Sequence, residues 1–145
     1  VIIGKSGRDI EAVEEHIFGY TILNDVTARD VQKEHVQFFR GKSFDTFCPM
    51  GPFIVTPDEL QFPLRIKTNV NGETRQDGTT ADMIRPIDEL VRTLSKGMTL
   101  EAGDIIATGT PAGVGHGMTP PTYLQTGDTV EVTIEGLGTL RNVIV

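Results

Sequence analysis

The sequence has little cysteine, no tryptophan and no long apolar run. Cys48 is the only cysteine, which excludes a disulfide framework and a zinc site built from several cysteines. No run of about 18 apolar residues predicts a membrane-spanning helix, and no period of roughly 20 to 50 residues indicates a repeat array. With no signal peptide evident, we expect a reducing compartment: the cytoplasm or, in a eukaryote, the mitochondrial matrix.

Positive charge is also scarce. The 145 residues include 20 acidic and 13 basic side chains, which gives a formal net charge of -7. Such a balance argues against nucleic acid and anionic membranes as partners, but an acidic surface can still hold a local basic pocket. The length is that of one domain, which can bury roughly 68–70% of its unfolded surface, so residues 1–145 are expected to form a single domain.

Apolar patterning predicts an α+β protein that is mainly β. Expected strands are Phe18–Leu23, Phe53–Thr56, Leu64–Val70, Ile105–Thr108, Thr129–Ile134 and Thr139–Val145. Asn71-Gly72 predicts a tight hairpin, with Glu73–Gln76 returning antiparallel and Asp77–Asp82 forming a polar loop.

Two short helices are expected. One runs from Ala28 to about His35, and the other begins at Pro86 and stops at Gly97, with apolar side chains at helical spacing between them. The chain opens with Val1-Ile2-Ile3, which has the composition of a strand entered part way along, so we expect further residues upstream.

An acid, a base and an amide are concentrated where the first long strand should meet the first helix. Thr27 and Asp30 have the spacing of a capping box, and Asp25 lies in the turn before them. Arg29 and Gln32 are three positions apart and should share one helix face. An anionic ligand held by a metal on Asp25 could therefore reach both side chains. The alternative is an ordinary Asp25–Arg29 ion pair with Thr27 acting only as a cap.

The segment from Gly41 to Pro52 is dense in glycine and proline and too apolar to be disordered. Ordered loops of this kind often carry functional groups, and Lys42 is a point charge that could meet a carboxylate or polarise a carbonyl. The alternative is a solvated lysine beside Phe44 and Phe47, which would then plug the core.

A second segment rich in glycine and proline spans Gly109 to Gly115. Thr110 offers a hydroxyl and an N–H there, and the glycines permit close backbone approach, so an oxyanion could be held at this point. The segment does not match a phosphate loop, because the G-x-x-x-x-G-K-[ST] pattern is absent. His116 lies in the same region, but a lone histidine is more often structural than catalytic.

Taken in order, several motifs together form a specific pattern that covers essentially the whole chain. They are Asn24-Asp25, Ala28 to Gln32, Gly41 to Pro49, Gly51-Pro52, Val70 to Glu73, Gly103-Asp104, Thr108 to Pro111, Gly113 to Gly115 and Gly127-Asp128. This set resembles the catalytic C-terminal domain of the fumarylacetoacetate hydrolase family, and it looks closest to the bacterial and mitochondrial members of the domain-2-containing type.

The resemblance implies a mixed, largely antiparallel β-roll with short helices, a homodimer, and a divalent cation held by three carboxylates. The cation would be Mg²⁺, or alternatively Mn²⁺ or Ca²⁺. One metal carboxylate of the family pattern falls on Asp25, the substrate-contacting arginine and glutamine on Arg29 and Gln32, the catalytic, substrate-contacting lysine on Lys42, and the threonine on Thr110. The other two carboxylates belong to a Glu-x-Glu expected just ahead of Val1, and the lid residue that activates water is expected further upstream. The sequence therefore resembles an N-terminally truncated form of the domain.

The implied activity is metal-dependent chemistry on short 2-oxo dicarboxylates or acylpyruvates through a metal-bound enolate. Carbon–carbon hydrolysis, decarboxylation and keto–enol tautomerisation all pass through such an enolate. Among single substrates, the resemblance to the domain-2-containing type favours oxaloacetate. Alternatives on the same scaffold are a ureidoglycolate lyase or an isomerase or decarboxylase of aromatic catabolism. A truncated domain without catalysis is the remaining alternative: the missing Glu-x-Glu favours it, whereas the retained polar residues oppose it.

Overall fold

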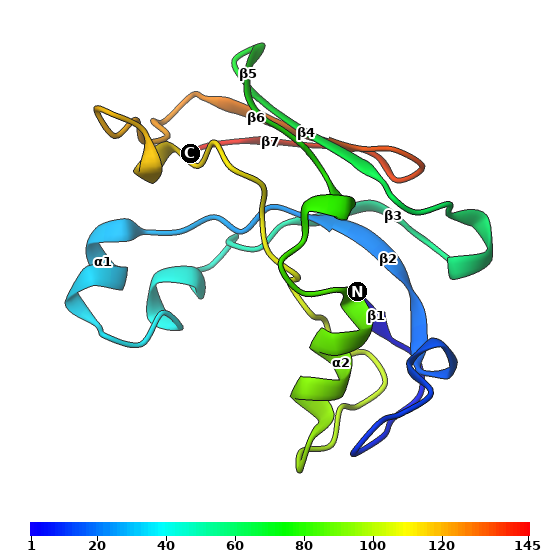
Figure 1. The fold of residues 1–145 in the computed structure, drawn as a ribbon. Helices are drawn as coiled ribbons and strands as arrows, with labels where there is room; N and C mark the ends of the chain where they lie inside the picture. Colours follow the sequence, from blue (N-terminus) through cyan, green and yellow to red (C-terminus); the bar gives the residue numbers. More distant parts are fainter.

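Two antiparallel sheets form the frame of the molecule, as seen in a computed structural model that describes all 145 residues (Figure 1). The first sheet has the strand order β1-β2-β3, with β1 at Ile2–Ile3, β2 at Ile17–Leu23 and β3 at Met50–Val55. The β2–β3 register shifts between Tyr20 and Ile22, so this ladder is irregular.

The second sheet has the order β5-β4-β6-β7. Its strands are β4 (Arg65–Val70), β5 (Glu73–Thr79), β6 (Thr129–Ile134) and β7 (Gly138–Val143). The hairpin predicted at Asn71-Gly72 is confirmed: both residues have positive φ, 52° and 81°, as a type I′ turn requires. With two helices and two antiparallel sheets, the predicted α+β, mainly β class is also confirmed.

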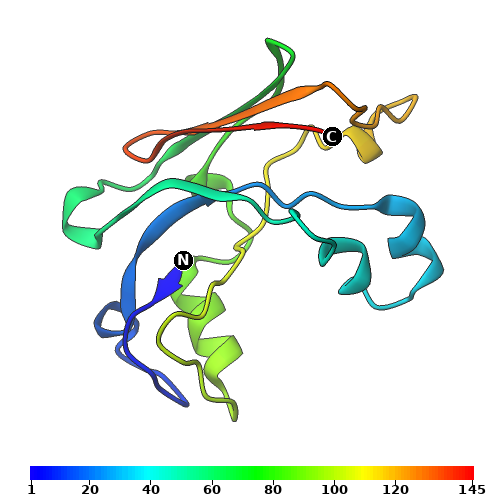
Figure 2. The same ribbon diagram turned by 180° about the vertical axis from the view of Figure 1, so that it is seen from behind.

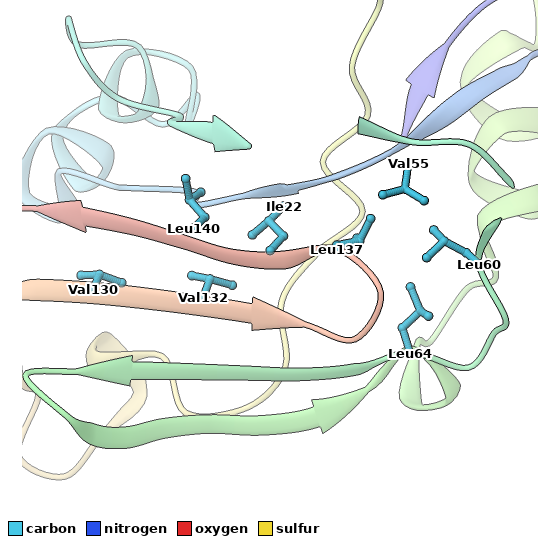
Figure 3. Close-up of a cluster of buried hydrophobic side chains, with 8 residues drawn as sticks. All are labelled: Ile22, Val55, Leu60, Leu64, Val130, Val132, Leu137 and Leu140. Carbon is cyan, nitrogen blue, oxygen red and sulfur yellow. The ribbon is translucent and has the colours of Figure 1, made fainter. Parts of the chain in front are cut away.

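The larger hydrophobic core lies where the two sheets face each other (Figure 3). Ile22 from β2 and Val55 from β3 point toward β6 and β7, and Ile22 is completely buried. The full cluster is Ile22, Val55, Leu60, Leu64, Val130, Val132, Leu137 and Leu140. Because Ile22 lies so close to the end of β2, this core anchors the start of the segment that carries Asp25.

A second cluster lies under helix α2 (Ile87–Ser95), at the end of the molecule that holds β1 (Figure 1). It contains Ile3, Ile10, Val13, Val91 and Leu100. The helix begins directly after Pro86, which confirms the second predicted helix. No helix of the structure has both the length and the apolar character needed to cross a membrane.

A projecting arm carries the remaining helical residues. Helix α1 (Arg29–Glu34) and the 3-10 turn η2 (Arg40–Lys42) extend from one side of the sheets, as both views show (Figures 1 and 2). None of the α1 residues is buried. The arm therefore holds together through its own contacts, not through either core.

Two predicted elements differ in the structure. The expected strand Ile105–Thr108 is wrong: only Ile105 makes an isolated bridge, to Ile2, because the two-residue strand β1 is too short to support a longer ladder. The expected polar loop Asp77–Asp82 is partly strand, since β5 continues through Thr79 along the full length of β4.

Candidate active site

The residues at the end of β2 are fixed from both sides. Asn24 donates its backbone N–H to the carbonyl of Pro49 at 3.0 Å, and its side-chain amide donates to Asn142 Oδ1 of β7 at 3.3 Å. The chain leaves the sheet immediately after Asn24, so the side chain of Asp25 stands at the surface with half of its area exposed.

Lys42 is the ionic partner of Asp25. Its Nζ donates to Asp25 Oδ2 and also lies 3.3 Å from Thr27 Oγ1. The alternative Asp25–Arg29 ion pair is not formed. Asp25 and Thr27, which precede α1, thus meet Lys42, which follows it, at one corner, which we call the β2–α1 corner (Asp25, Thr27 and Lys42).

Arg29 and Gln32 form a second pair, on helix α1, which begins directly after that corner. Arg29 Nη1 donates to Gln32 Oε1 at 2.8 Å, which confirms that the two side chains share one face of α1. Arg29 has no carboxylate partner in the structure, so its remaining N–H groups can receive an anion. Since Gln32 accepts through its oxygen, its NH₂ group is also available to a ligand.

Gly41 joins the lysine segment to the start of α1. The N–H of Ala28 donates to the carbonyl of Gly41 at 2.9 Å, and Gly41 is buried. A Cβ added to Gly41 would lie 3.0 Å from both Ala28 O and Gln32 Cβ. The two segments therefore approach as closely as a glycine allows, and Lys42 follows directly.

The predicted Thr27–Asp30 capping box is wrong. Ala28 is the N-cap of α1, and no side chain caps this helix. The hydroxyl of Thr27 donates instead to the carbonyl of Asp25 at 3.1 Å, which leaves it turned away from the helix N–H groups. The core-plugging alternative for Phe44 is also wrong, because its ring packs on Phe47 at 5.4 Å but remains 44% exposed.

Thr110 lies on a different support. Gln76 of β5 donates through Nε2 to Thr110 Oγ1 and to the carbonyl of Pro111, both at 2.8 Å. Gly113 explains why this loop follows β5 so closely: a Cβ there would lie 1.9 Å from the carbonyl oxygen of Arg75. Thr110 makes no hydrogen bond to the β2–α1 corner.

The sequence does not predict the contacts that Gln76 and Thr27 make. A glutamine in a returning strand carries no motif, and the spacing of Thr27 and Asp30 indicates a helix cap instead. His116 bonds through Nδ1 to the hydroxyl of Tyr123 at 3.1 Å, with the two rings stacked at 6.0 Å, which agrees with a structural role.

Other polar contacts shape the surroundings without entering the corner. Asp128 accepts the N–H of Gln125 and the side-chain amide of Asn71, and these bonds hold the pKa of the Asp128 carboxyl below its usual value. A hollow of about 440 Å³ lies elsewhere, lined by Tyr20, Phe62 and Asp88 among others. There, burial and then the charge of Asp88 raise the pKa of Tyr20.

The residues present do not by themselves form a metal centre. Asp25 is the only carboxylate at the corner that meets Lys42, and no group of three or more histidine, cysteine, aspartate or glutamate side chains in residues 1–145 could hold a metal ion. Mg²⁺ requires near-octahedral oxygen ligation, which one carboxylate cannot supply. The carboxylate of Asp25 is moreover already neutralised by Lys42.

Known proteins match this chain along its whole length. The family model described as "Fumarylacetoacetate (FAA) hydrolase C-terminal" matches residues 1–145. The oxaloacetate tautomerase YisK of Bacillus subtilis (strain 168) is 61% identical over 148 residues, which cover 99% of this chain and 49% of that protein.

Solved structures give the same result. A fumarylacetoacetate hydrolase from the psychrophilic Exiguobacterium antarcticum superposes with a TM-score of 0.96 at 60% identity, covering 99% of this chain and 53% of that one. A 5-carboxymethyl-2-hydroxymuconate delta-isomerase from Mycobacterium smegmatis gives 0.88 at 46% identity, covering 99% and 55%. The chain thus spans about half the length of these relatives.

The relatives named above are a tautomerase, a hydrolase and an isomerase, so the fold that this chain shares with them is an enzyme fold. The chain belongs to the fumarylacetoacetate hydrolase family.

Proposed function

We propose that this protein acts on short 2-oxo acids and that its reaction is the keto–enol tautomerisation of oxaloacetate. The observation that carries the proposal is the position of the Lys42 ammonium, which Asp25 and Thr27 hold on the same arm that carries the Arg29–Gln32 pair. The 61% identity with an oxaloacetate tautomerase supports the choice of substrate.

The chemistry of oxaloacetate suits these groups. Tautomerisation removes a proton from the carbon next to the ketone, moves that electron pair into a carbon–carbon double bond, and places a proton on the former ketone oxygen. Negative charge develops on that oxygen, and Lys42 is proposed as the catalytic cation that stabilises it. Arg29 and Gln32 would hold one carboxylate of the substrate, and Thr110 would hold the other.

We further propose Asp25 as one ligand of a divalent cation, Mg²⁺ or alternatively Mn²⁺ or Ca²⁺. The family match supports this proposal. No further carboxylate, histidine or cysteine side chain of residues 1–145 joins Asp25 in a metal-binding group. The remaining ligands must therefore be other groups, and ligation of an ion by Asp25 requires that Lys42 release that carboxylate.

The test is to follow the decay of enol-oxaloacetate absorbance with the purified protein, before and after EDTA treatment. We expect the protein to accelerate this decay, and we expect Lys42→Ala to reduce the acceleration by about 100-fold while the protein folds normally. Lys33→Ala is the matched control, since Lys33 is an exposed lysine of the same arm without an ion pair. Acceleration that survives Lys42→Ala would remove lysine from the mechanism. Activity only on an acylpyruvate or a hydroxymuconate would replace tautomerisation with hydrolysis or isomerisation.

We also propose that the protein forms a homodimer. An average monomer of 15.8 kDa exposes about 7,300 Å², whereas this chain exposes 9179 Å², an excess of roughly 1,900 Å². Val36, Phe38 and Phe39 of the arm are 88%, 61% and 79% exposed and are the side chains we expect a second copy to cover.

Light scattering tests this assembly. Phe39→Glu should halve the measured mass, because it places a charge on the proposed contact. Ile84→Glu is the control, since Ile84 is 98% exposed but lies outside the arm. A wild-type protein that is monomeric at micromolar concentration would contradict the proposal.

A further inference from the structure

The hydroxyl of Thr27 lies between two other parts of the β2–α1 corner. It donates to the backbone carbonyl of Asp25 at 3.1 Å and lies 3.3 Å from the ammonium of Lys42. Its side chain is partly buried, and it takes no part in capping α1. Helix capping therefore does not explain the position of the Thr27 hydroxyl.

The direction of the two bonds follows from the chemistry of the groups. A hydroxyl has one proton and two acceptor lone pairs, and an ammonium can only donate. Because the carbonyl of Asp25 can only accept, the Thr27 proton must point to it, and a lone pair is then left for Lys42. The bond to the carbonyl thus orients the hydroxyl as an acceptor for the lysine.

Two neighbouring residues, Thr27 and Ala28, hold the two ends of Lys42. Ala28 bonds the backbone of Gly41, next to the lysine, at 2.9 Å, and Thr27 meets the ammonium at the far end of the side chain. A lysine side chain with free rotation loses more entropy on ordering than most side chains. Fixing both ends removes part of that cost before a substrate binds.

We propose that Thr27 is a positioning residue for Lys42, and that its hydroxyl, by accepting one ammonium N–H, turns another N–H of the ammonium toward the ligand. Thr27 takes one of the three ammonium N–H groups and, in this structure, Asp25 takes another. A third N–H is therefore left for the substrate oxygen, and release of Asp25 to a cation would free a second one. This inference rests on the proposed function for its catalytic consequence, but the geometry of Lys42 can be tested without it.

The first experiment compares Thr27→Val, Thr27→Ser and the control Thr133→Val in the tautomerase assay. Valine keeps the shape and removes the hydroxyl, whereas serine keeps the hydroxyl. Thr133 is a suitable control because its hydroxyl bonds only that of Thr139, on the exposed surface of the β6–β7 hairpin. Thr27→Val should lower kcat roughly 10- to 100-fold with KM changed less than about threefold, since the lost contact acts on developing charge. Thr27→Ser should recover most of kcat.

The second experiment reads Lys42 directly. In a spectrum of ¹³C-labelled lysine, with the signal assigned through Lys42→Arg, the two Hε protons of an immobilised side chain are inequivalent. They should become equivalent in Thr27→Val and stay inequivalent in Thr27→Ser and Thr133→Val. If the wild-type protein had no tautomerase activity but the Hε protons still became equivalent in Thr27→Val, the positioning role would hold and the proposed reaction would be rejected. Unchanged Lys42 signals in Thr27→Val, or a serine variant as defective as valine, would overturn the inference.

Discussion

Gly113→Ala tests whether the loop that carries Thr110 is held against β5 by close backbone contact. The added Cβ would lie 1.9 Å from the carbonyl oxygen of Arg75, and Gly113 has a φ of 107°, which side chains rarely adopt. To restore an ordinary contact of about 3.4 Å, the loop must move off β5 by roughly 1.5 Å.

The expected cost has two parts. Overpacking costs about 1–3 kcal/mol, and the unfavourable φ adds about 1–3 kcal/mol, so the free energy of unfolding should fall by about 2–6 kcal/mol. For a chain of this size that corresponds to a loss of at least about 4 °C in Tm. Because Thr110 moves with the loop, kcat/KM should also fall, by roughly 100-fold for a shift near 1 Å.

Urea denaturation and the tautomerase assay measure these two effects. Gly117→Ala is the matched control: it lies in the same region, has no unusual φ and would meet nothing within 4 Å, so its cost should stay within about 0.5 kcal/mol. If Gly113→Ala were as stable and as active as Gly117→Ala, the close contact with Arg75 would not exist in solution.

Three further predictions concern stability and binding. The pKa of Asp128 is lower in the folded protein than its usual value of about 3.9, so its contribution to stability is present above that pH and is lost as the pH falls through the folded pKa. Asp128→Asn should therefore flatten the acid side of a plot of urea midpoint against pH. An unchanged acid side would contradict this prediction. Ile22→Ala should cost about 2–5 kcal/mol because Ile22 is fully buried, whereas Ile84→Ala, at a 98% exposed position, should cost less than about 0.5 kcal/mol in the same assay; equal costs would mean that the core is misplaced. Arg29→Lys should raise KM for oxaloacetate roughly tenfold by removing the planar fork that bonds Gln32, and an unchanged KM would exclude Arg29 from substrate binding.

Elements with a local sequence signal were predictable. The alternation in β4 and β6 and the Asn71-Gly72 turn depend on neighbours in sequence, so their positions agree with the structure. Ile105–Thr108 has the composition of a strand, but a strand also needs a partner, and β1 offers only two residues. The pairing of distant segments could not be inferred from composition.

The site likewise has contacts that the sequence predicts and contacts that it does not. Arg29 and Gln32 are neighbours because of helix spacing, which the sequence contains. Lys42 is 17 residues from Asp25 in the sequence, and it reaches Asp25 because Gly41 packs closely on Ala28, the residue before α1. Gln76 and Thr110 are 34 residues apart and meet because Gly113 lets the loop approach β5, a contact that no single-sequence pattern encodes.

Calorimetric titration of oxalate, a small mimic of a 2-oxo acid enolate, tests the central claim most directly: that Lys42 and its neighbours form an anion site for such substrates. The wild-type protein and Lys33→Ala should bind oxalate with the same affinity, and Lys42→Ala should bind it about tenfold more weakly, because it loses a charged hydrogen-bond donor. If Lys42→Ala bound oxalate as tightly as the wild type, or if the wild type bound none with or without added Mg²⁺, the β2–α1 corner would not be the substrate site.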